Sequence, residues 1–201
     1  GKLMSAIKAA ALAAQERFEE AQYQLDNANR LQTAMDQISS NVMIADGKLD
    51  IIYMNHHMTS FFETREKQLQ KALPNLKANT ILGSNIDIFH KNPEHNRAML
   101  KTIEEPTLAK IQVAGFHMDL NVIPVYNRSG HKTATIVEWR DKTAEVQLIE
   151  QVGAAVDAAK EGILNKRIDL TDTDGTVKIV GGKINELINN IKELMDVNGI
   201  S

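Results

Sequence analysis

The sequence contains no cysteine, and this absence excludes several kinds of site. Disulfides, thiolate metal sites, iron–sulfur clusters, cysteine nucleophiles and chromophores attached through sulfur are all ruled out. Aromatic residues make up only 4% of the 201 residues, which argues against one large globular core. Any cofactor must therefore be held by histidine, by carboxylates or by packing.

A surplus of one charge sign and long hydrophobic runs are also lacking. The formal net charge is −3 with interspersed signs, so there is no basic stripe for nucleic acid. No apolar run approaches the roughly 18 to 20 residues that a membrane span requires. No charged and then apolar signal peptide opens the chain. We expect a soluble, cytoplasmic segment that binds no nucleic acid and has no membrane span.

Residues 2 to about 38 contain no glycine or proline and predict one long helix. Its apolar residues recur at alternating steps of three and four, a heptad seam: Met4, Ile7, Ala11, Ala14, Phe18, Ala21, Leu25 and Ala28. A narrow seam requires a partner helix, and about 37 residues would be long for a helix packed on its own domain. We expect residues 1–40 to form a dimeric coiled coil or the end of a HAMP-type signalling module.

The pattern changes after Ser39-Ser40-Asn41 to short strands separated by turns. We predict strands at residues 42–45, 51–54, 107–114, 116–125 and 132–140, and helical segments at residues 56–73 and 93–103. Apolar side chains alternate along the later strands: Phe116, Met118, Leu120 and Val122 share one face, as do Thr135, Val137 and Trp139. Such alternation predicts an α+β fold whose five-stranded antiparallel sheet has helices on one face.

A further helix is predicted to begin at Asp141-Lys142-Thr143, where either Asp141 or Thr143 can cap its free N–H groups. It carries another three-four seam from Val146 to Ile163. Residues 165–182 are predicted to be a connector, followed by a last amphipathic helix. So long a connector permits parallel helices, which in a homodimer would form a four-helix bundle.

Three stretches resemble a known architecture. Asn41-Val-Met-Ile-Ala-Asp-Gly47 followed by Ile51-Ile-Tyr-Met-Asn55 resembles the opening hairpin of a PAS domain, and Trp139-Arg-Asp-Lys-Thr143 resembles its close. Between them, Ile86-Asp-Ile-Phe-His-Lys-Asn-Pro-Glu-His95 resembles the haem-binding PAS domains of Aer-type soluble aerotaxis receptors, which are methyl-accepting chemotaxis proteins. The resemblance assigns residues 41–143 to the PAS sensor, and residues 144–201 resemble a two-helix HAMP module.

This resemblance implies haem b, with His90 as the axial ligand of the iron. It implies that Trp139 donates a hydrogen bond to bound oxygen and that Leu120 lies over the distal pocket. It also implies a homodimer that senses oxygen and signals through its flanking helices to a chemotaxis histidine kinase or adaptor, by way of an output domain outside this sequence. Carbon monoxide and nitric oxide remain open as gas ligands.

The chemistry of these residues suits the implied roles. Imidazole is the usual axial base of haem where no thiolate is present. An indole N–H only donates, so it stabilises the partial negative charge on oxygen and favours oxygen over carbon monoxide. The alternative for His90 is a capping or core histidine, and for Trp139 simple core filling. His95 is the rival ligand, but its neighbours Glu94, Asn96 and Arg97 indicate a solvated face.

Two other functions stay open. A PAS domain that binds flavin, another small ligand or nothing could act as a dimerising signalling module. A non-haem metalloenzyme at His90 is disfavoured, because His90 and Glu94-His95 lack zincin spacing and Pro93 interrupts the helix. No catalytic constellation is found, so we expect no enzyme. In the favoured interpretation, ligand binding shifts the sheet, and the junction at Asp141 and Thr143 passes the shift to the next helix.

Overall fold

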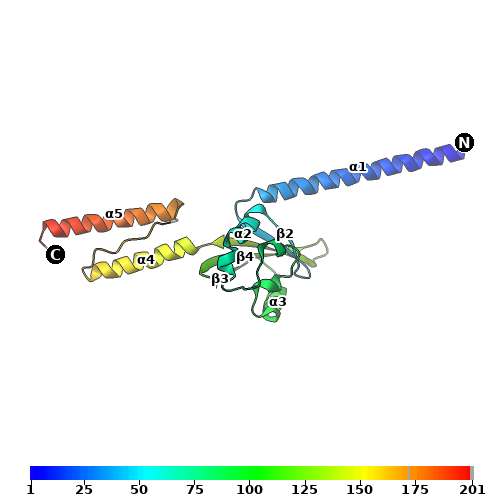
Figure 1. Cartoon of the computed structure of the whole chain (residues 1–201). Helices are drawn as coiled ribbons and strands as arrows, with labels where there is room; N and C mark the ends of the chain where they lie inside the picture. Colours follow the sequence, from blue (N-terminus) through cyan, green and yellow to red (C-terminus); the bar gives the residue numbers. More distant parts are fainter. Residues whose placement is uncertain (172, 200–201) are drawn as a thin grey trace.

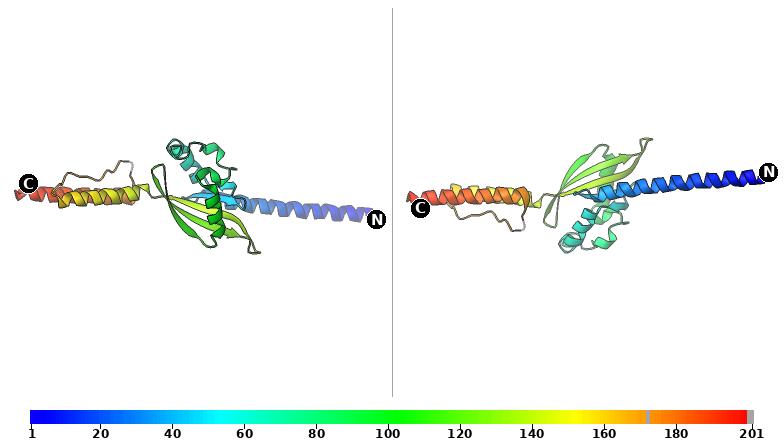
Figure 2. Two further views of the ribbon diagram at one scale, coloured as in Figure 1. Left: turned by 90° about the horizontal axis from the view of Figure 1, so that it is seen from below. Right: turned by 90° about the horizontal axis from the view of Figure 1, so that it is seen from above.

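The computed structural model describes residues 1–171 and 173–199. A central sheet with its helices lies between a long N-terminal helix and a C-terminal pair of helices (Figure 1). The N-terminal helix and the C-terminal pair extend from the sheet in opposite directions, so the molecule is elongated (Figure 2). Among the described helices, none is both long enough and apolar enough to cross a membrane.

Helix α1 (Lys2–Asp36) closely matches the predicted N-terminal helix and ends two residues earlier. It has no buried residue: Phe18 and Leu25 on the seam are 62% and 61% exposed. A helix that buries none of its apolar seam gains no stability from tertiary packing within this chain. The coiled-coil partner of α1 stays a prediction.

The central sheet has five antiparallel strands in the order β2-β1-β5-β4-β3. They are β1 (Asn41–Asp46), β2 (Ile51–Met54), β3 (Thr107–Val113), β4 (Phe116–Tyr126) and β5 (Lys132–Asp141). The segment between β2 and β3 contains α2 (His56–Leu69), the short 3₁₀ helices η1 (Ala78–Thr80) and η2 (Ile86–Phe89), and α3 (Pro93–Thr102). The predicted α+β fold and its five-stranded antiparallel sheet are confirmed. The helical stretch predicted to reach residue 73 ends at Leu69, before the loop that contains Pro74.

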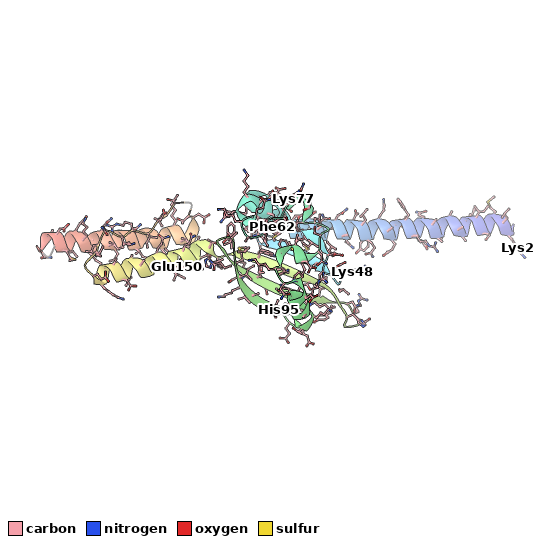
Figure 3. All side chains as sticks on the ribbon, turned by 60° about the horizontal axis from the view of Figure 1, so that its bottom comes forward. Lys2, Lys48, Phe62, Lys77, His95 and Glu150 are labelled. Atoms are coloured by element: carbon pink, nitrogen blue, oxygen red, sulfur yellow. The ribbon has the colours of Figure 1, made fainter. Side chains whose placement is uncertain are left out.

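One face of the sheet forms the core together with α2. Phe116, Met118 and Val122 of β4 are buried there, as the alternation predicted. Helix α2 supplies Met58, Phe62 and Leu69 to the same core, and Phe62 is only 1% exposed (Figure 3). A fully buried aromatic side chain stabilises a fold by about 3–5 kcal/mol relative to alanine, so α2 is firmly attached to the sheet.

Helices α4 (Thr143–Lys160) and α5 (Gly175–Val197) form the C-terminal pair. The connector returns towards the sheet, and both helices then run away from it in the same direction (Figure 1). A small separate core holds them together around Ala155 of α4, Ile168 of the connector and Ile188 of α5. The parallel arrangement is the one that a long connector permits, while the four-helix bundle and the dimer stay predictions.

The predicted connector at residues 165–182 was too long, because α5 already begins at Gly175. Gly181 and Gly182 lie inside α5 and do not interrupt it. A Cβ atom at position 181 would lie 2.5 Å from Cδ2 of Leu170 and 3.0 Å from Cγ2 of Ile168. Glycine therefore allows the connector to lie close against the helix, and it does not mark a helix end.

Candidate functional site

A pocket of about 460 Å³ lies between the inner face of the sheet and the α2–η2–α3 segment. His90, Leu120 and Trp139, the three predicted cofactor-binding residues, all line it. This volume falls within the range of about 300–1,000 Å³ that is usual for small-molecule sites. Most of the remaining lining is apolar, and it includes Met43, Phe62, Leu69, Ala72, Leu73, Ile86, Phe89, Met99, Leu100, Ala109, Ile111, Val113, Ala114, Val122 and Val137.

Two capped helices hold His90 in place. Asn85 is the N-cap of η2, and its side chain accepts a hydrogen bond from the backbone N–H of Asp87 at 3.3 Å. His90 follows as the C-cap residue of η2, in extended conformation. Asn92 then caps α3, whose first helical residue is Pro93. The Asn-Pro step therefore ends one helix and starts the next, with His90 at the bend.

The His90 imidazole has a defined tautomer in this position. Its Nδ1 lies 2.9 Å from the backbone carbonyl oxygen of Ile86. A carbonyl oxygen only accepts hydrogen bonds, so in the neutral ring this contact assigns the proton to Nδ1 and the lone pair to Nε2. A histidine that donates from one ring nitrogen to a backbone carbonyl is typical of metal ligands, because the bond orients the ring and makes the free nitrogen more basic.

A salt bridge joins η2 to α3 on the outside of this bend. The Arg97 guanidinium donates to both carboxylate oxygens of Asp87, with 3.1 Å from Nε to Oδ1. These contacts with Asp87 raise the pKa of Arg97 above its ordinary value. Since the pair is exposed, it contributes little stability. Its bidentate geometry links η2 to α3 across the bend that contains His90.

Trp139, which lines the pocket, contains an unusual polar atom. The side chain is 7% exposed, and its Nε1 has no hydrogen-bond partner. Among residues 1–171 and 173–199, it is the only buried side-chain nitrogen or oxygen of this kind. Leaving a buried donor unsatisfied costs about 1–3 kcal/mol. A ligand that offers an acceptor inside the pocket would remove this cost.

Two phenylalanines of the pocket had no predicted role. The rings of Phe62 and Phe89 are stacked with centroids 5.5 Å apart, and each meets the Trp139 ring edge-on at 5.7 Å. Phe89 comes directly before His90, and Phe62 lies on the buried face of α2. With aromatics so scarce in the sequence, the position of Phe89 directly before His90 was the available signal, and no such signal existed for Phe62. These rings form an apolar, aromatic wall that suits a flat ligand.

The other histidines lie away from the pocket. His95 is exposed on α3 (Figure 3), in agreement with the predicted solvated face. His56, His57 and His131 are exposed as well, and His117 lies beside Gln112 with 3.4 Å between the two Nε2 atoms. Within the described part of the chain, no group of three or more His, Asp or Glu side chains is placed to share a metal ion.

The junction between β5 and α4 differs in detail from the predicted cap. Lys142 takes the N-cap position, and its side chain makes no capping bond. Asp141 accepts the N–H of Thr143 at 2.9 Å, so it satisfies one free N–H of the first turn as predicted. The Thr143 hydroxyl does not cap α4 and instead accepts the backbone N–H of His117 at 3.0 Å. Because the His117 carbonyl accepts the Lys142 N–H at 2.7 Å, the start of α4 is tied to β4.

A family model described as a PAS domain matches residues 29–102. The chain contains a PAS domain. The match covers α1's last turns, the β1–β2 hairpin, α2, η1, η2 and α3, and the five-stranded antiparallel sheet agrees with the predicted PAS fold. The predicted PAS domain is thus confirmed, whereas the roles of His90, Leu120 and Trp139 stay predictions.

The chain is also similar to individual PAS-containing proteins. It is 35% identical to the methyl-accepting chemotaxis protein McpB of Pseudomonas aeruginosa over 159 residues. The aligned region covers 79% of this chain and 23% of McpB. The Aer2 receptor of Vibrio cholerae, described as a dual PAS-haem oxygen sensor, has a solved structure with 33% identity and a TM-score of 0.47, covering 51% of this chain and 93% of that one. The PAS domain of Bordetella pertussis BvgS shares 17% identity and a TM-score of 0.42, over 67% and 98% of the two chains. The chain spans about a quarter of the length of McpB.

Proposed function

We propose that the PAS domain binds haem b in the pocket beneath Trp139, with His90 as the axial ligand, and senses a diatomic gas, oxygen in the first place. The observation that carries this proposal is the pairing of two groups in one apolar pocket. One is a histidine whose Nε2 lone pair is free, and the other is a buried indole N–H without an acceptor. Haem, when bound, supplies an iron that takes an imidazole nitrogen on one side and a gas on the other.

Each pocket residue has a defined part in this proposal. The Ile86 carbonyl orients the His90 ring through Nδ1, so Nε2 is the nitrogen that would meet the iron. Leu120 keeps the gas side of the pocket apolar and excludes water. The Trp139 N–H donates to a ligand atom that carries partial negative charge, which favours oxygen over carbon monoxide because oxygen carries more of it.

The proposed signal leaves the pocket through β5. Trp139 is separated by only one residue from Asp141, where β5 ends and α4 follows almost directly. Since the Thr143 hydroxyl also holds the N–H of His117 on β4, a shift of either strand reaches the first turn of α4. We propose that α4 and α5 pass this shift, in a homodimer, to a chemotaxis histidine kinase. The similarity to McpB supports a chemoreceptor context.

Haem titration of the purified chain tests the proposal. Addition of haemin should give a sharp Soret absorption band with one haem per chain, and oxygen should shift the band of the reduced protein. The variant His90→Ala should lose this band, while the matched control His95→Ala, which changes an exposed histidine five residues away, should keep it. A colourless protein, or a His90→Ala variant with an unaltered spectrum, would contradict haem ligation by His90.

A further inference from the structure

Asn55 lies at the meeting point of α1, β1 and α2, and its side chain is fully buried. Its Oδ1 accepts two backbone N–H groups, from Val42 of β1 and from Met58 in the first turn of α2, each at 3.0 Å. The second of these bonds makes Asn55 the N-cap of α2. The same oxygen therefore joins the start of the sheet to the start of the helix.

The amide nitrogen of Asn55 faces the end of α1. Its Nδ2 lies 2.8 Å from the carbonyl oxygen of Ser40, 3.3 Å from that of Ile38 and 3.4 Å from that of Met35. The Met35 carbonyl belongs to the last turn of α1, where it also accepts the Ile38 N–H at 3.2 Å, and the Ile38 and Ser40 carbonyls belong to the linker that follows. One side chain thus holds the last turn of α1 and the linker that follows it against the sheet.

A second contact holds α1 at the same place. The hydroxyl of Tyr53 on β2 donates to Oδ1 of Asp36, the last residue of α1, at 2.8 Å. No residue of α1 is buried in this chain, so these contacts at its end are what hold it to the sheet. Its direction relative to the sheet therefore depends on Asn55 and Tyr53.

Helix α2 connects this meeting point to the pocket. Its N-terminus is capped by Asn55, and two turns further along Phe62 is stacked on Phe89 and packed edge-on against Trp139. In Figure 1 α2 lies beside the end of α1. A ligand that occupies the pocket must displace some of these rings. Because α2 is tightly packed, a change in its contacts with the core moves the helix as a rigid element.

We propose that Asn55 is a coupling residue, which transmits the state of the pocket through α2 to the direction of α1. The pocket would then act on both ends of the PAS domain, through Asn55 at α1 and through the Asp141–Thr143 junction at α4. The inference rests on the proposed function only for the identity of the ligand, because the contacts between Asn55, α2 and α1 do not involve haem.

The absence of cysteine allows a direct measurement. Spin labels are attached to the exposed positions 17 on α1 and 133 on β5 through Arg17→Cys and Thr133→Cys. Labelled chain is diluted with excess unlabelled chain, so that pulsed electron resonance reports distances within one protomer. The Soret band is recorded on every sample first. The mean label distance is expected to shift between haem-free and haem-loaded wild-type chain.

Two substitutions remove the coupling contacts, each with a matched control. Asn55→Asp keeps the two accepted bonds but replaces the donor to the Met35, Ile38 and Ser40 carbonyls by an oxygen. Asn185→Asp makes the same change on α5, where the side chain accepts the Ile168 N–H and donates to the Ile168 carbonyl, away from both α1 and the pocket. Tyr53→Phe removes the bond to Asp36, and Tyr126→Phe removes a similar exposed bond to the Glu104 carbonyl. Tyr53→Phe changes only one hydroxyl, so it serves if Asn55→Asp does not fold. We expect the two coupling variants to keep the Soret band and to lose the distance shift. The two control variants should keep the Soret band and the distance shift.

The inference is overturned if haem loading leaves the wild-type distance unchanged, or if Asn55→Asp and Tyr53→Phe retain the wild-type shift. If the chain takes up no haem, the proposed function fails, and the coupling is tested without ligand. Phe89→Ala then removes the ring that stacks on Phe62. The single variant should shift the label distance relative to wild type, whereas adding Phe89→Ala to Tyr53→Phe should not. An equal shift in both backgrounds would overturn the coupling by itself.

Discussion

Leu120 of β4 and Trp139 of β5 are directly paired across the two strands, on the face of the sheet that lines the pocket. Directly opposed residues in an antiparallel pair have Cβ atoms only about 4.5–5.5 Å apart. An apolar side chain and the single unsatisfied indole N–H of the described residues therefore lie side by side in the wall. The pairing predicts a site from which water is excluded and in which one hydrogen-bond donor is available.

Trp139→Phe separates these two properties, because it keeps an aromatic ring and removes the donor. A hydrogen bond to a charged partner contributes about 1.5–3 kcal/mol, which is about a tenfold change in affinity or more. We expect the variant to keep its haem and to bind oxygen at least about tenfold more weakly, while carbon monoxide affinity changes little. Gas titrations followed by absorption measure both. An equal loss for the two gases would indicate a packing role for Trp139.

Thr143→Val tests the junction with an isosteric side chain that cannot accept the His117 N–H. Because the α4 start would lose one of its ties to β4, we expect faster amide hydrogen exchange in the first turn of α4 and no change in the Soret band. Asp141→Ala, which removes the acceptor for the Thr143 N–H, should have the same effect. Under the proposed function, both should uncouple the output of a full-length chemoreceptor from gas binding. Loss of haem from either variant would contradict a junction role.

Gly181→Ala and Gly182→Ala form a matched pair in α5. A Cβ at position 181 would meet Leu170 at 2.5 Å, whereas at position 182 the nearest atom, again from Leu170, is 4.0 Å away. We expect Gly181→Ala to destabilise the C-terminal pair by about 1–3 kcal/mol through overpacking. Gly182→Ala should be neutral or stabilise it by up to about 1 kcal/mol, since alanine favours the helix. Thermal unfolding followed by circular dichroism compares them, and equal midpoints would contradict the close approach.

Tyr53 predicts a pH dependence in the alkaline range. Burial, together with the hydrogen bond to Asp36 and the charge of that carboxylate, raises the pKa of Tyr53 from 10.0 to about 12. The folded state thus favours the neutral phenol, so its contribution to stability is full below about pH 10 and is lost as the pH rises to about 12. Denaturant unfolding between pH 9 and 12 should show a steeper loss of stability for wild type than for Tyr53→Phe. Parallel curves would contradict the buried bond.

Much of the sensor fold could be predicted before any coordinates. Strand alternation around Met118 and Val137 follows from the two-residue period of a sheet, and it remains valid whatever the strands pack against. His90 and Trp139 could be singled out together because a short sequence motif and the only tryptophan carry them. Their position in one pocket depends on contacts between segments far apart in the sequence, such as the pairing of β5 with β1.

The errors have a common cause. The connector was extended to Gly182 because glycine lowers the intrinsic preference for helix, and tertiary packing of α5 against Leu170 outweighs that preference. Thr143 was one of two predicted caps, with Asp141, because threonine caps helices locally, but the nearby β4 strand supplies a competing donor. Asn55 had no predicted role, because its bonds to the end of α1 and the linker that follows arise only in the folded chain.

By itself, the sequence determined the PAS domain, the helical character of both flanks, and the absence of any thiol-based site, since these follow from periodicity, turn residues and composition. Only the tertiary structure decided that Nε2 of His90 is the free nitrogen, that the Trp139 N–H has no partner, and that one asparagine joins α1 to α2. The physical reason is that hydrogen bonds are made between groups brought together by folding, and a linear pattern does not record which donor finds which acceptor.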